Sequence, residues 1–186
     1  MMRMLDFDGI DRLNEHKLSD VYGVGTYVVK PFVSFLNEYC QHYEINTPLR
    51  MAAFLAQIGH ESGRMQFVEE IGKGYAYEGR KDLGNIHKGD GKKFKGRGLI
   101  QITGRANYTE MSNDVGIDFV SEPLMLAWPE YAVMSACWFW HKRKLNALAD
   151  KGEFKEITRR INGGYNGLED REKLYKKCKQ MFNINS

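Results

Sequence analysis

The sequence lacks the features that mark disulfide-rich, proline-rich or membrane-spanning chains. Its 186 residues include four prolines and three widely spaced cysteines without a Cys-x-x-Cys pair, which fits a reduced interior rather than a zinc site. The longest uninterrupted apolar run, residues 51–56, is far too short to cross a bilayer. The first eight residues turn acidic before any apolar stretch forms, so no secretory signal is visible and we expect synthesis in the cytoplasm.

The overall composition is that of a globular protein with an uneven charge. Hydrophobic residues make up 42% and charged residues 27% of the chain, which suits a single domain over residues 1–186. The net charge is only +3, but residues 88–105 carry a net +5 and residues 141–179 a net +6. This asymmetry indicates a basic surface for a polyanion such as nucleic acid, an acidic envelope or lipid headgroups. The alternative is that solvated helix faces are simply rich in lysine.

Apolar residues recur at helical spacing through most of the chain. The spacing predicts helices over residues 32–43, 47–62, 131–140, 154–161 and 174–181, the third of them apolar on nearly every side and therefore buried. Thr47 and Pro48 form a typical helix start. Residues 72–98 show no helical period and predict a long loop or hairpin. The fold class is therefore mainly α.

Three glutamates are candidates for acid–base chemistry. Glu61 stands near the end of the second predicted helix, on the same face as Phe54 and Ile58. An apolar flank and the negative end of the helix dipole disfavour an ionised carboxylate, and a carboxyl that stays protonated suits a general acid. Glu69 and Glu70 follow on a separate element, from which a second carboxylate could face the first, as glycoside hydrolysis requires. The alternative is that these are solvated turn residues.

The sequence contains no clear motif for metal-dependent or cysteine-dependent catalysis. His60-Glu61 does not begin a zinc motif, because Arg64 stands where His-Glu-x-x-His needs its second histidine. Cys137 lies inside the buried helix, which favours packing over a nucleophilic role. We therefore expect neither a metal nor a cofactor.

Several ordered motifs resemble one known family. They are Phe-Leu-Ala-Gln-Ile-Gly-His-Glu-Ser at 54–62, Gly-Asp-Gly at 89–91 and Phe-Lys-Gly-Arg-Gly-Leu-Ile-Gln-Ile-Thr-Gly-Arg at 94–105. This pattern resembles glycoside hydrolase family 19, which holds chitinases and many bacteriophage endolysins. The resemblance covers about residues 45–180, whereas residues 1–30 match nothing. It implies a lysozyme-like, two-lobed helical fold with a catalytic cleft and a short loop or hairpin region.

The resemblance also implies roles for individual residues. Glu61 is similar to the general acid, Glu70 (rather than its neighbour Glu69) to the general base, and Thr103 to the hydroxyl that holds the attacking water. The substrate-binding positions are Gln101, Asn107, Tyr108 and Asn162, while Arg171 and His60 support the carboxylates. An alternative role for Thr103 and Asn107 is to cap a following helix, and for Asn162 to end one.

The function implied is that of a compact phage endolysin. The stretch from Glu70 to Phe94 is shorter than the loops of typical chitinases in this family, which suits an open groove for cross-linked peptidoglycan. We therefore expect a muramidase-type hydrolase of β-1,4 bonds in peptidoglycan glycan strands. It would be made in the host cytoplasm and would lyse the bacterial cell from the periplasm once the membrane is permeabilised.

The resemblance and the distribution of charge also predict the binding partners of the protein and leave two alternative functions open. We expect a monomer that binds no nucleic acid and whose basic C-terminal segment contacts the anionic envelope. The alternatives are a chitinase that acts on N-acetylglucosamine polymers and a non-catalytic module that binds glycans or membranes.

Overall fold

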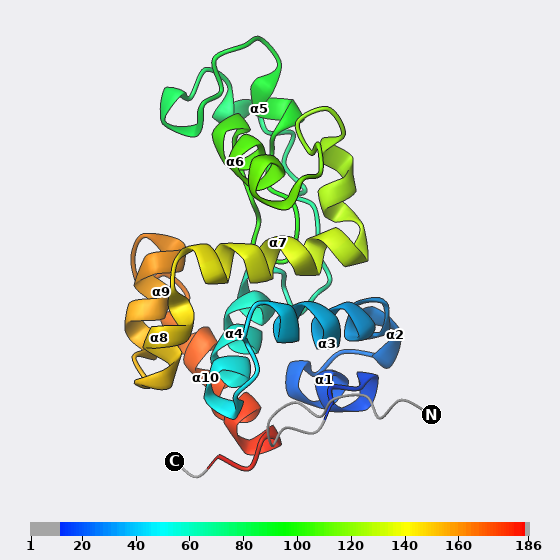
Figure 1. Cartoon of the computed structure of the whole chain (residues 1–186), viewed down its shortest axis with the longest axis vertical. Helices are drawn as coiled ribbons and strands as arrows, with labels where there is room; N and C mark the ends of the chain where they lie inside the picture. Colours follow the sequence, from blue (N-terminus) through cyan, green and yellow to red (C-terminus); the bar gives the residue numbers. More distant parts are fainter. Residues whose placement is uncertain (1–11, 185–186) are drawn as a thin grey trace.

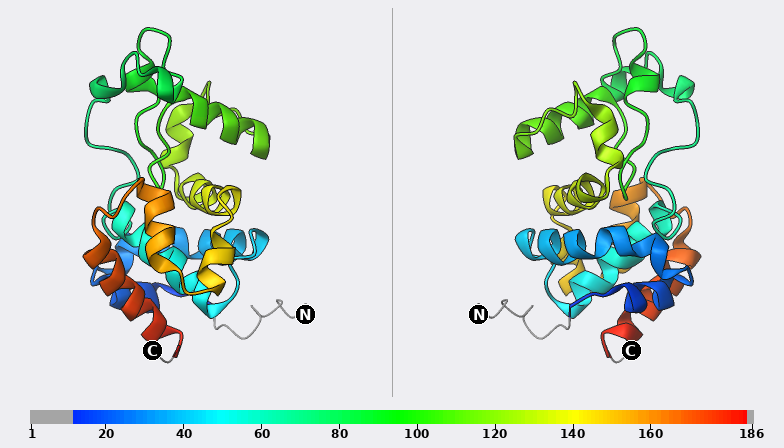
Figure 2. Two further views of the ribbon diagram at one scale, coloured as in Figure 1. Left: turned by 90° about the vertical axis from the view of Figure 1, so that its left-hand side faces the viewer. Right: turned by 90° about the vertical axis from the view of Figure 1, so that its right-hand side faces the viewer.

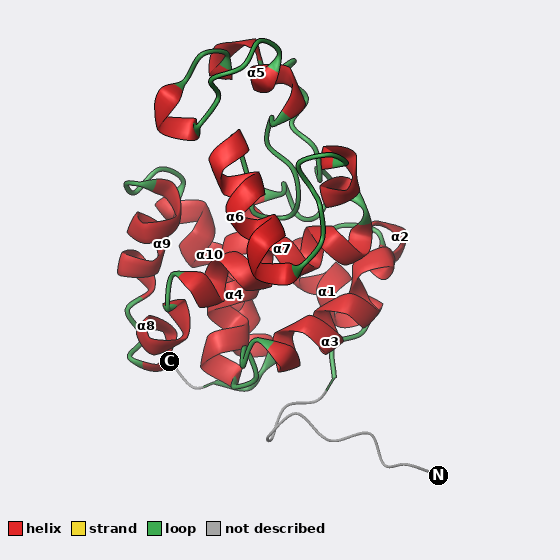
Figure 3. Ribbon diagram, turned by 45° about the horizontal axis from the view of Figure 1, so that its top comes forward, coloured by secondary structure: helices red, strands yellow, loops and turns green. Residues whose placement is uncertain are grey.

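The computed structural model describes residues 12–184, so the sequence-based statements about residues 1–11 and 185–186 lie outside it (Figure 1). The α-helices are α1 (Glu15–Tyr22), α2 (Thr26–Val29), α3 (Val33–His42), α4 (Pro48–Glu61), α5 (Asp90–Lys93), α6 (Arg105–Val115), α7 (Pro129–Lys142), α8 (Leu145–Asp150), α9 (Phe154–Asn162) and α10 (Leu168–Met181). The 3-10 helices are η1 (Lys30–Phe32), η2 (Tyr75–Tyr77), η3 (Lys81–Leu83) and η4 (Pro123–Ala127). The mainly α class is confirmed, and Figure 3 shows no strand in the part of the chain that is described.

The segment that resembled nothing in sequence contributes helices to the core. Asn14 starts α1, and its side-chain oxygen accepts a hydrogen bond from Lys17 N at 2.9 Å. Leu18 is fully buried, and the Tyr22 hydroxyl donates to the Leu55 carbonyl on α4 at 2.8 Å. This segment therefore packs directly against the helix that carries Glu61.

Helix α4 begins and ends where the sequence predicts. Thr47 Oγ1 accepts a hydrogen bond from Arg50 N at 3.3 Å, and Pro48 occupies the first helical position. Every residue from 51 to 59 is buried. Burial on all sides holds the C-terminal end of α4, and with it Glu61, in one fixed position.

Helix α7 is the predicted buried helix and crosses the middle of the molecule (Figure 1). Its Trp140 is fully buried and meets the ring of Phe54 edge-on, with 5.4 Å between centroids. Cys137 is also fully buried, and burial raises the pKa of its thiol. The packing interpretation of Cys137 is confirmed, because a reactive thiolate needs the opposite environment.

The helices form two lobes on either side of α7 (Figures 1 and 2). The lower lobe holds α1, α3, α4, α8, α9 and α10, while the upper lobe holds α5, α6 and the loops around them. In the predicted loop region, isolated antiparallel bridges pair Arg97 with Glu69 and with Ile102. No helix within residues 12–184 is both long and apolar enough to span a bilayer.

Candidate active site

Glu61 is the last residue of α4 and is held by an arginine from α10. Arg171 Nη2 lies 2.5 Å from Glu61 Oε1, and the two side chains are 2% and 20% exposed respectively. The same guanidinium donates from Nη1 to Gln57 Oε1 at 2.6 Å and from Nε to the Asn166 carbonyl at 3.2 Å. Glu61 thus sits at a polar junction rather than against the purely apolar flank that the sequence pattern indicated.

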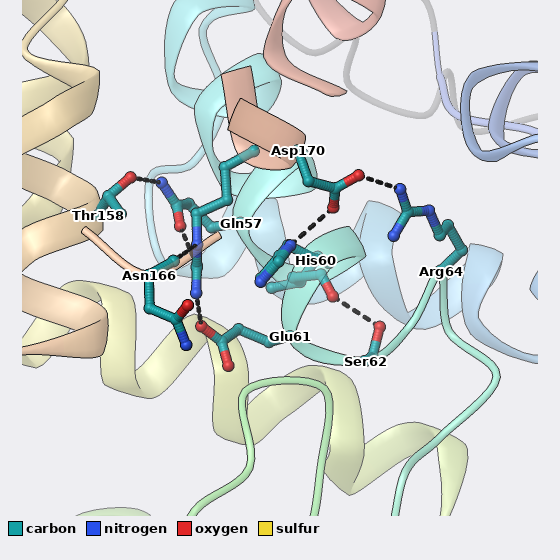
Figure 4. Close-up of polar contacts among 10 residues, drawn as sticks. Gln57, His60, Glu61, Ser62, Arg64, Thr158, Asn166 and Asp170 are labelled. Carbon is teal, nitrogen blue, oxygen red and sulfur yellow. Dashed lines mark hydrogen bonds and ion pairs between the residues drawn. The ribbon is translucent and has the colours of Figure 1, made fainter. Parts of the chain in front are cut away.

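Gln57 extends this junction to a third helix. Its Nε2 donates to Thr158 Oγ1 on α9 at 2.8 Å, and both side chains are fully buried (Figure 4). Because the amide has a donor and an acceptor, it satisfies Arg171 on one side and Thr158 on the other. Sequence analysis did not single out Gln57, although its place one helical turn before Glu61 was a usable signal.

His60 supports the same junction from the neighbouring face of α4. Its Nδ1 lies 2.7 Å from Asp170 Oδ2, and Arg64 pairs with the other carboxylate oxygen (Figure 4). Burial would raise the pKa of Asp170, but the hydrogen bonds from Arg64 and His60 outweigh it and hold this pKa below its usual value. Asp170 directly precedes Arg171, so this cluster fixes the start of α10 beside Glu61.

Gly167 allows α10 to approach this closely. Its φ is +69°, and a Cβ at this position would lie 2.3 Å from Nε2 of His60. Any other residue would be strained and would collide with the imidazole. The glycine therefore permits the contact that brings Arg171 to Glu61.

Glu70 lies after α4 and is anchored to the backbone around Gly96. Its Oε2 accepts from Gly96 N at 3.2 Å and its Oε1 accepts from the Tyr77 hydroxyl at 3.2 Å. Partial burial, followed by the negative charge of Glu70, raises the pKa of Tyr77. The hydroxyl therefore remains a hydrogen-bond donor to the carboxylate at neutral pH.

Gly96 also gathers two further predicted site residues around Glu70. A Cβ on Gly96 would lie 2.7 Å from Gln101 Oε1, 3.3 Å from Thr103 Oγ1 and 3.4 Å from Glu70 Oε2. These three oxygens therefore share one side of the glycine, which must lack a side chain. Gln101 has a φ of +59°, a conformation that non-glycine residues adopt rarely and often at functional sites.

Glu69 faces a different set of partners from Glu70. Its carboxylate lies 3.0 Å from Arg97 Nη2 and 3.2 Å from Lys95 Nζ. Arg97 is buried, with a side chain only 4% exposed. Glu69 is thus committed to a structural ion pair, which supports the prediction that Glu70 is the base.

A groove of about 420 Å³ lies between the upper lobe and the α7–α9 side of the molecule. Gln101, Thr103 and Asn107 line it from the upper lobe, and Ile161, the neighbour of Asn162, lines it from α9. Neither Glu61 nor Glu70 is among its lining residues. Gln101 and Thr103 line this groove and also lie near Glu70 around Gly96.

The alternative capping roles of Thr103 and Asn107 find no support in the structure, whereas Asn162 is the last residue of its helix, as its alternative role required. The residue that caps α6 is Gly104, without a side-chain hydrogen bond, and Thr103 Oγ1 donates to the Gln101 carbonyl at 3.0 Å. Asn107 Nδ2 donates to the Thr103 carbonyl at 2.7 Å. Asn162 is the exposed last residue of α9, and Gly163 in the left-handed conformation ends that helix.

Tyr108 is placed differently from the sequence-based expectation. Its side chain is fully buried, its hydroxyl accepts from Arg97 Nη1 at 3.0 Å, and it donates to the Lys95 carbonyl at 2.8 Å. Burial raises the pKa of this hydroxyl to about 12, although Arg97 acts in the opposite direction. Tyr108 therefore packs under the site and has no exposed surface to offer a sugar.

Two anchored carboxylates on separate elements, one of them next to amide and hydroxyl side chains that line a groove, suit a polysaccharide hydrolase. The family described as class I chitinase, glycoside hydrolase family 19, matches residues 22–158. This chain belongs to that family and is a glycosidase. Asn162 and Arg171 lie beyond the matched range.

The relatives are bacterial and plant proteins. A glycosyl hydrolase family 19 domain-containing protein of Haemophilus influenzae is 35% identical, over 69% of this chain and 78% of that protein. Two relatives named endochitinase, from Arabidopsis thaliana and Zea mays, are 34% and 30% identical, over 75% and 76% of this chain. The chain spans only about half of these plant endochitinases, 48% and 51% of their lengths.

Solved structures with the same fold cover nearly the whole chain. Chitinase C from Streptomyces griseus superposes with a TM-score of 0.77 at 20% identity, over 92% of this chain and 77% of that chain. A family 19, class IV chitinase from Zea mays superposes with a TM-score of 0.75 at 24% identity, over 93% and 94%. The lysozyme-like, two-lobed fold is therefore confirmed.

Proposed function

We propose that this glycosidase hydrolyses β-1,4 bonds in the glycan strands of peptidoglycan, with Glu61 as general acid and Glu70 as general base. The observation that carries the mechanism is that each carboxylate is held by a donor from a distant part of the chain. Arg171 orients Glu61, and the Gly96 amide orients Glu70. In this scheme Glu61 donates a proton to the glycosidic oxygen, while Glu70 accepts a proton from the attacking water.

The residues around Gly96 suit the attacking water. Thr103 Oγ1 and Gln101 Oε1 lie on the same side of this glycine as Glu70 Oε2. A hydroxyl and an amide can orient a water molecule without competing with the base for its proton. Asn107 and Asn162 are assigned to the sugar, whose hydroxyl and N-acetyl groups need both donors and acceptors.

Peptidoglycan is preferred as substrate because the stretch from Glu70 to Phe94, which would form a wall of the cleft, is short and the groove is charged. The segment from Glu70 to Phe94 contains only short helical turns, and Glu110, Lys142 and Arg143 line the groove. Chitin is the second candidate, since several relatives are named endochitinases. Compactness alone does not separate the two substrates, because this chain covers 94% of the maize class IV chitinase.

The biological role that we propose is that of a phage endolysin acting as a monomer on the wall of its host. It would be made in the cytoplasm and would reach the periplasm through a permeabilised membrane. Leu174 and Cys178, from the apolar stripe of α10, are buried, so contact with an anionic envelope would use the exposed lysines alone. A basic surface of this kind suits an acidic envelope, and no nucleic-acid partner is proposed.

The decisive experiment is digestion of purified peptidoglycan and of chitin, with mass spectrometry of the new reducing ends. Muramic acid at those ends supports the muramidase proposal, whereas cleavage of chitin alone would make the protein a chitinase. Glu61→Gln is the control, and loss of both digestions is expected because the amide cannot donate the proton. A Glu61→Gln protein that still lysed cells would point instead to a non-catalytic glycan- or membrane-binding module.

A further inference from the structure

The groove beside the candidate site contains a cation that no described carboxylate neutralises. Its charged lining residues are Glu110, Lys142 and Arg143. Lys142 Nζ lies 3.0 Å from Glu110 Oε1 and 2.8 Å from Asp114 Oδ2, so its charge is paired. Arg143 forms no ion pair with any residue between 12 and 184. Of the three charged residues that line the groove, Arg143 is therefore the one whose charge is available to a ligand.

Arg143 is held in place by an aromatic ring. Its guanidinium carbon lies 4.4 Å from the centroid of the Phe139 ring, which also lines the groove. Stacking of this kind occupies the face of the guanidinium and leaves its edge, with a fork of N–H groups, open. Arg143 is exposed, and Trp138 and Ile161 add apolar surface to the same groove. A planar fork in such a setting matches a carboxylate.

The position of Arg143 relates this charge to the sugar. Gln101, Thr103 and Asn107 line the same groove from the upper lobe, and Arg143, the residue that follows α7, lines it as well. A sugar bound by the amides would therefore present its substituents toward the guanidinium. Polymers of N-acetylglucosamine carry no carboxylate, whereas peptidoglycan strands carry carboxyl groups on the lactyl ether of muramic acid or on the stem peptide.

We infer that Arg143 binds a carboxylate attached to the N-acetylated sugar in this groove and so selects peptidoglycan over uncharged glycans. This inference rests on the proposed function and assigns Arg143 as a residue that determines specificity. It requires no part in bond cleavage, because the glutamates do the acid–base chemistry. Loss of the guanidinium should therefore weaken binding of the anionic substrate and leave the turnover of bound substrate nearly unchanged.

The test compares Arg143→Gln with Lys144→Gln, which removes the same charge one residue further on. Lys144 is exposed and is not among the lining residues of this groove. Three soluble substrates are used: sonicated peptidoglycan, the same strands after an amidase has removed the stem peptides, and chitohexaose. We expect Arg143→Gln to raise KM about tenfold on one or both peptidoglycan substrates, with kcat within about twofold, as loss of a charge-assisted bidentate contact implies.

The three substrates separate the possible outcomes. An effect confined to intact peptidoglycan identifies a stem-peptide carboxylate, and one confined to stripped strands identifies the lactyl carboxylate. Equal behaviour of the two variants on both peptidoglycan substrates, or an equal loss on chitohexaose, would overturn the role of Arg143. Cleavage of chitohexaose but not of peptidoglycan by the unmodified enzyme would instead overturn the proposed substrate, and the inference with it.

Discussion

Arg171 Nη2 lies 2.5 Å from Glu61 Oε1, and this ion pair joins the first turns of α10 to the last residue of α4. The arginine is almost completely buried, so its charge depends on partners within the protein. Those partners are Glu61, Gln57 and the Asn166 carbonyl. The orientation of the proposed acid is therefore coupled to the docking of the C-terminal helix.

The first prediction is that Arg171→Met lowers both activity and stability. The change keeps an unbranched buried stem but leaves Gln57 and Glu61 without their donor, which should cost about 2–3 kcal/mol in the free energy of unfolding. Chemical denaturation monitored by circular dichroism measures this cost. Activity should fall on every glycan substrate that the enzyme cleaves, because Glu61 is no longer oriented.

A double-mutant cycle tests whether the loss of stability in Arg171→Met comes from the ion pair with Glu61. Glu61→Gln keeps an oxygen that accepts from Arg171 and should cost only about 1 kcal/mol, while abolishing hydrolysis. The double variant should be more stable than the sum of the two single losses predicts, since each change removes the attraction between the same two charges. Strict additivity would show that Arg171 and Glu61 do not support each other.

The second prediction separates the two neighbouring glutamates. Glu70→Gln should reduce kcat on the order of a hundredfold or more, because an amide cannot accept the proton of the attacking water. Glu69→Gln should retain activity below its melting temperature but lose about 1 kcal/mol of stability, because buried Arg97 loses its carboxylate partner. Initial rates and melting curves of both variants test this assignment. A larger loss of rate in Glu69→Gln than in Glu70→Gln would make Glu69 the base.

The third prediction concerns Tyr108 as a structural residue. Tyr108→Phe removes the hydroxyl that bridges Arg97 and the Lys95 carbonyl, and should cost about 1–2 kcal/mol in stability with KM and kcat unchanged. Asn107→Ala serves as the contrast, because Asn107 lines the groove and should raise KM. A rise in KM for Tyr108→Phe without loss of stability would return it to the sugar-binding residues.

Sequence patterns predicted the helix that carries Glu61 better than they predicted the contacts around this glutamate. The extent of α4 could be read from Thr47-Pro48 and from the apolar stripe that ends at Glu61, since caps and periodicity are local signals. Gln57 and Asp170 were missed because their importance comes from contacts between helices distant in sequence. Periodicity within one helix cannot report such contacts.

The upper lobe shows the same limit for a different reason. The clustering of Gln101, Thr103 and Glu70 depends on a backbone path around Gly96 that has no helical or strand repeat. Resemblance placed these residues in one site, but hydrophobic pattern could not. Tyr108 illustrates the opposite case, because the resemblance placed it with Asn107 among the sugar-binding residues, whereas the structure buries its side chain. Successive helix positions face different sides.

The fourth prediction concerns acid stability of the loop that precedes Gly96. Asp90 accepts hydrogen bonds from Arg105 Nε at 2.9 Å and from His87 N at 3.0 Å. The Arg105 guanidinium is the main reason why the pKa of Asp90 is held below its usual value of 3.8, against the effect of burial. Because the folded pKa is depressed, this stabilisation is present above pH 3.8 and is lost as the pH falls through the folded pKa.

Asp90→Asn is the variant that tests this dependence. It should be less stable than the unmodified protein at pH 7, and the difference should shrink as the pH is lowered below 3.8, where the carboxylate of the unmodified protein becomes protonated. Denaturation at a series of pH values measures the difference. A constant difference across the acid range would show that the charge of Asp90 contributes nothing.

The fifth prediction concerns four lysines of α10, of which Lys179 is half-buried and the other three are exposed. Lys176 and Lys177 border a hollow of about 330 Å³ together with Arg64, while Lys173 pairs with Glu169 and Lys179 lies over the Tyr175 ring. If these charges concentrate the enzyme at an anionic envelope, replacing the four lysines with glutamine should slow lysis of permeabilised cells several-fold at low salt. The effect should fade near physiological salt, where the Debye length is about 8 Å.

A second set of substitutions tests whether position or total charge matters. Four other exposed lysines, changed to glutamine, remove the same charge from different surfaces: Lys30, Lys81, Lys151 and Lys155. Only the α10 variant should lyse cells more slowly, and both variants should cleave a small soluble oligosaccharide normally because the glutamates are untouched. Equal slowing by the two sets would attribute the effect to net charge, and loss on the oligosaccharide would indicate damage to the fold. Either result would contradict envelope contact through α10.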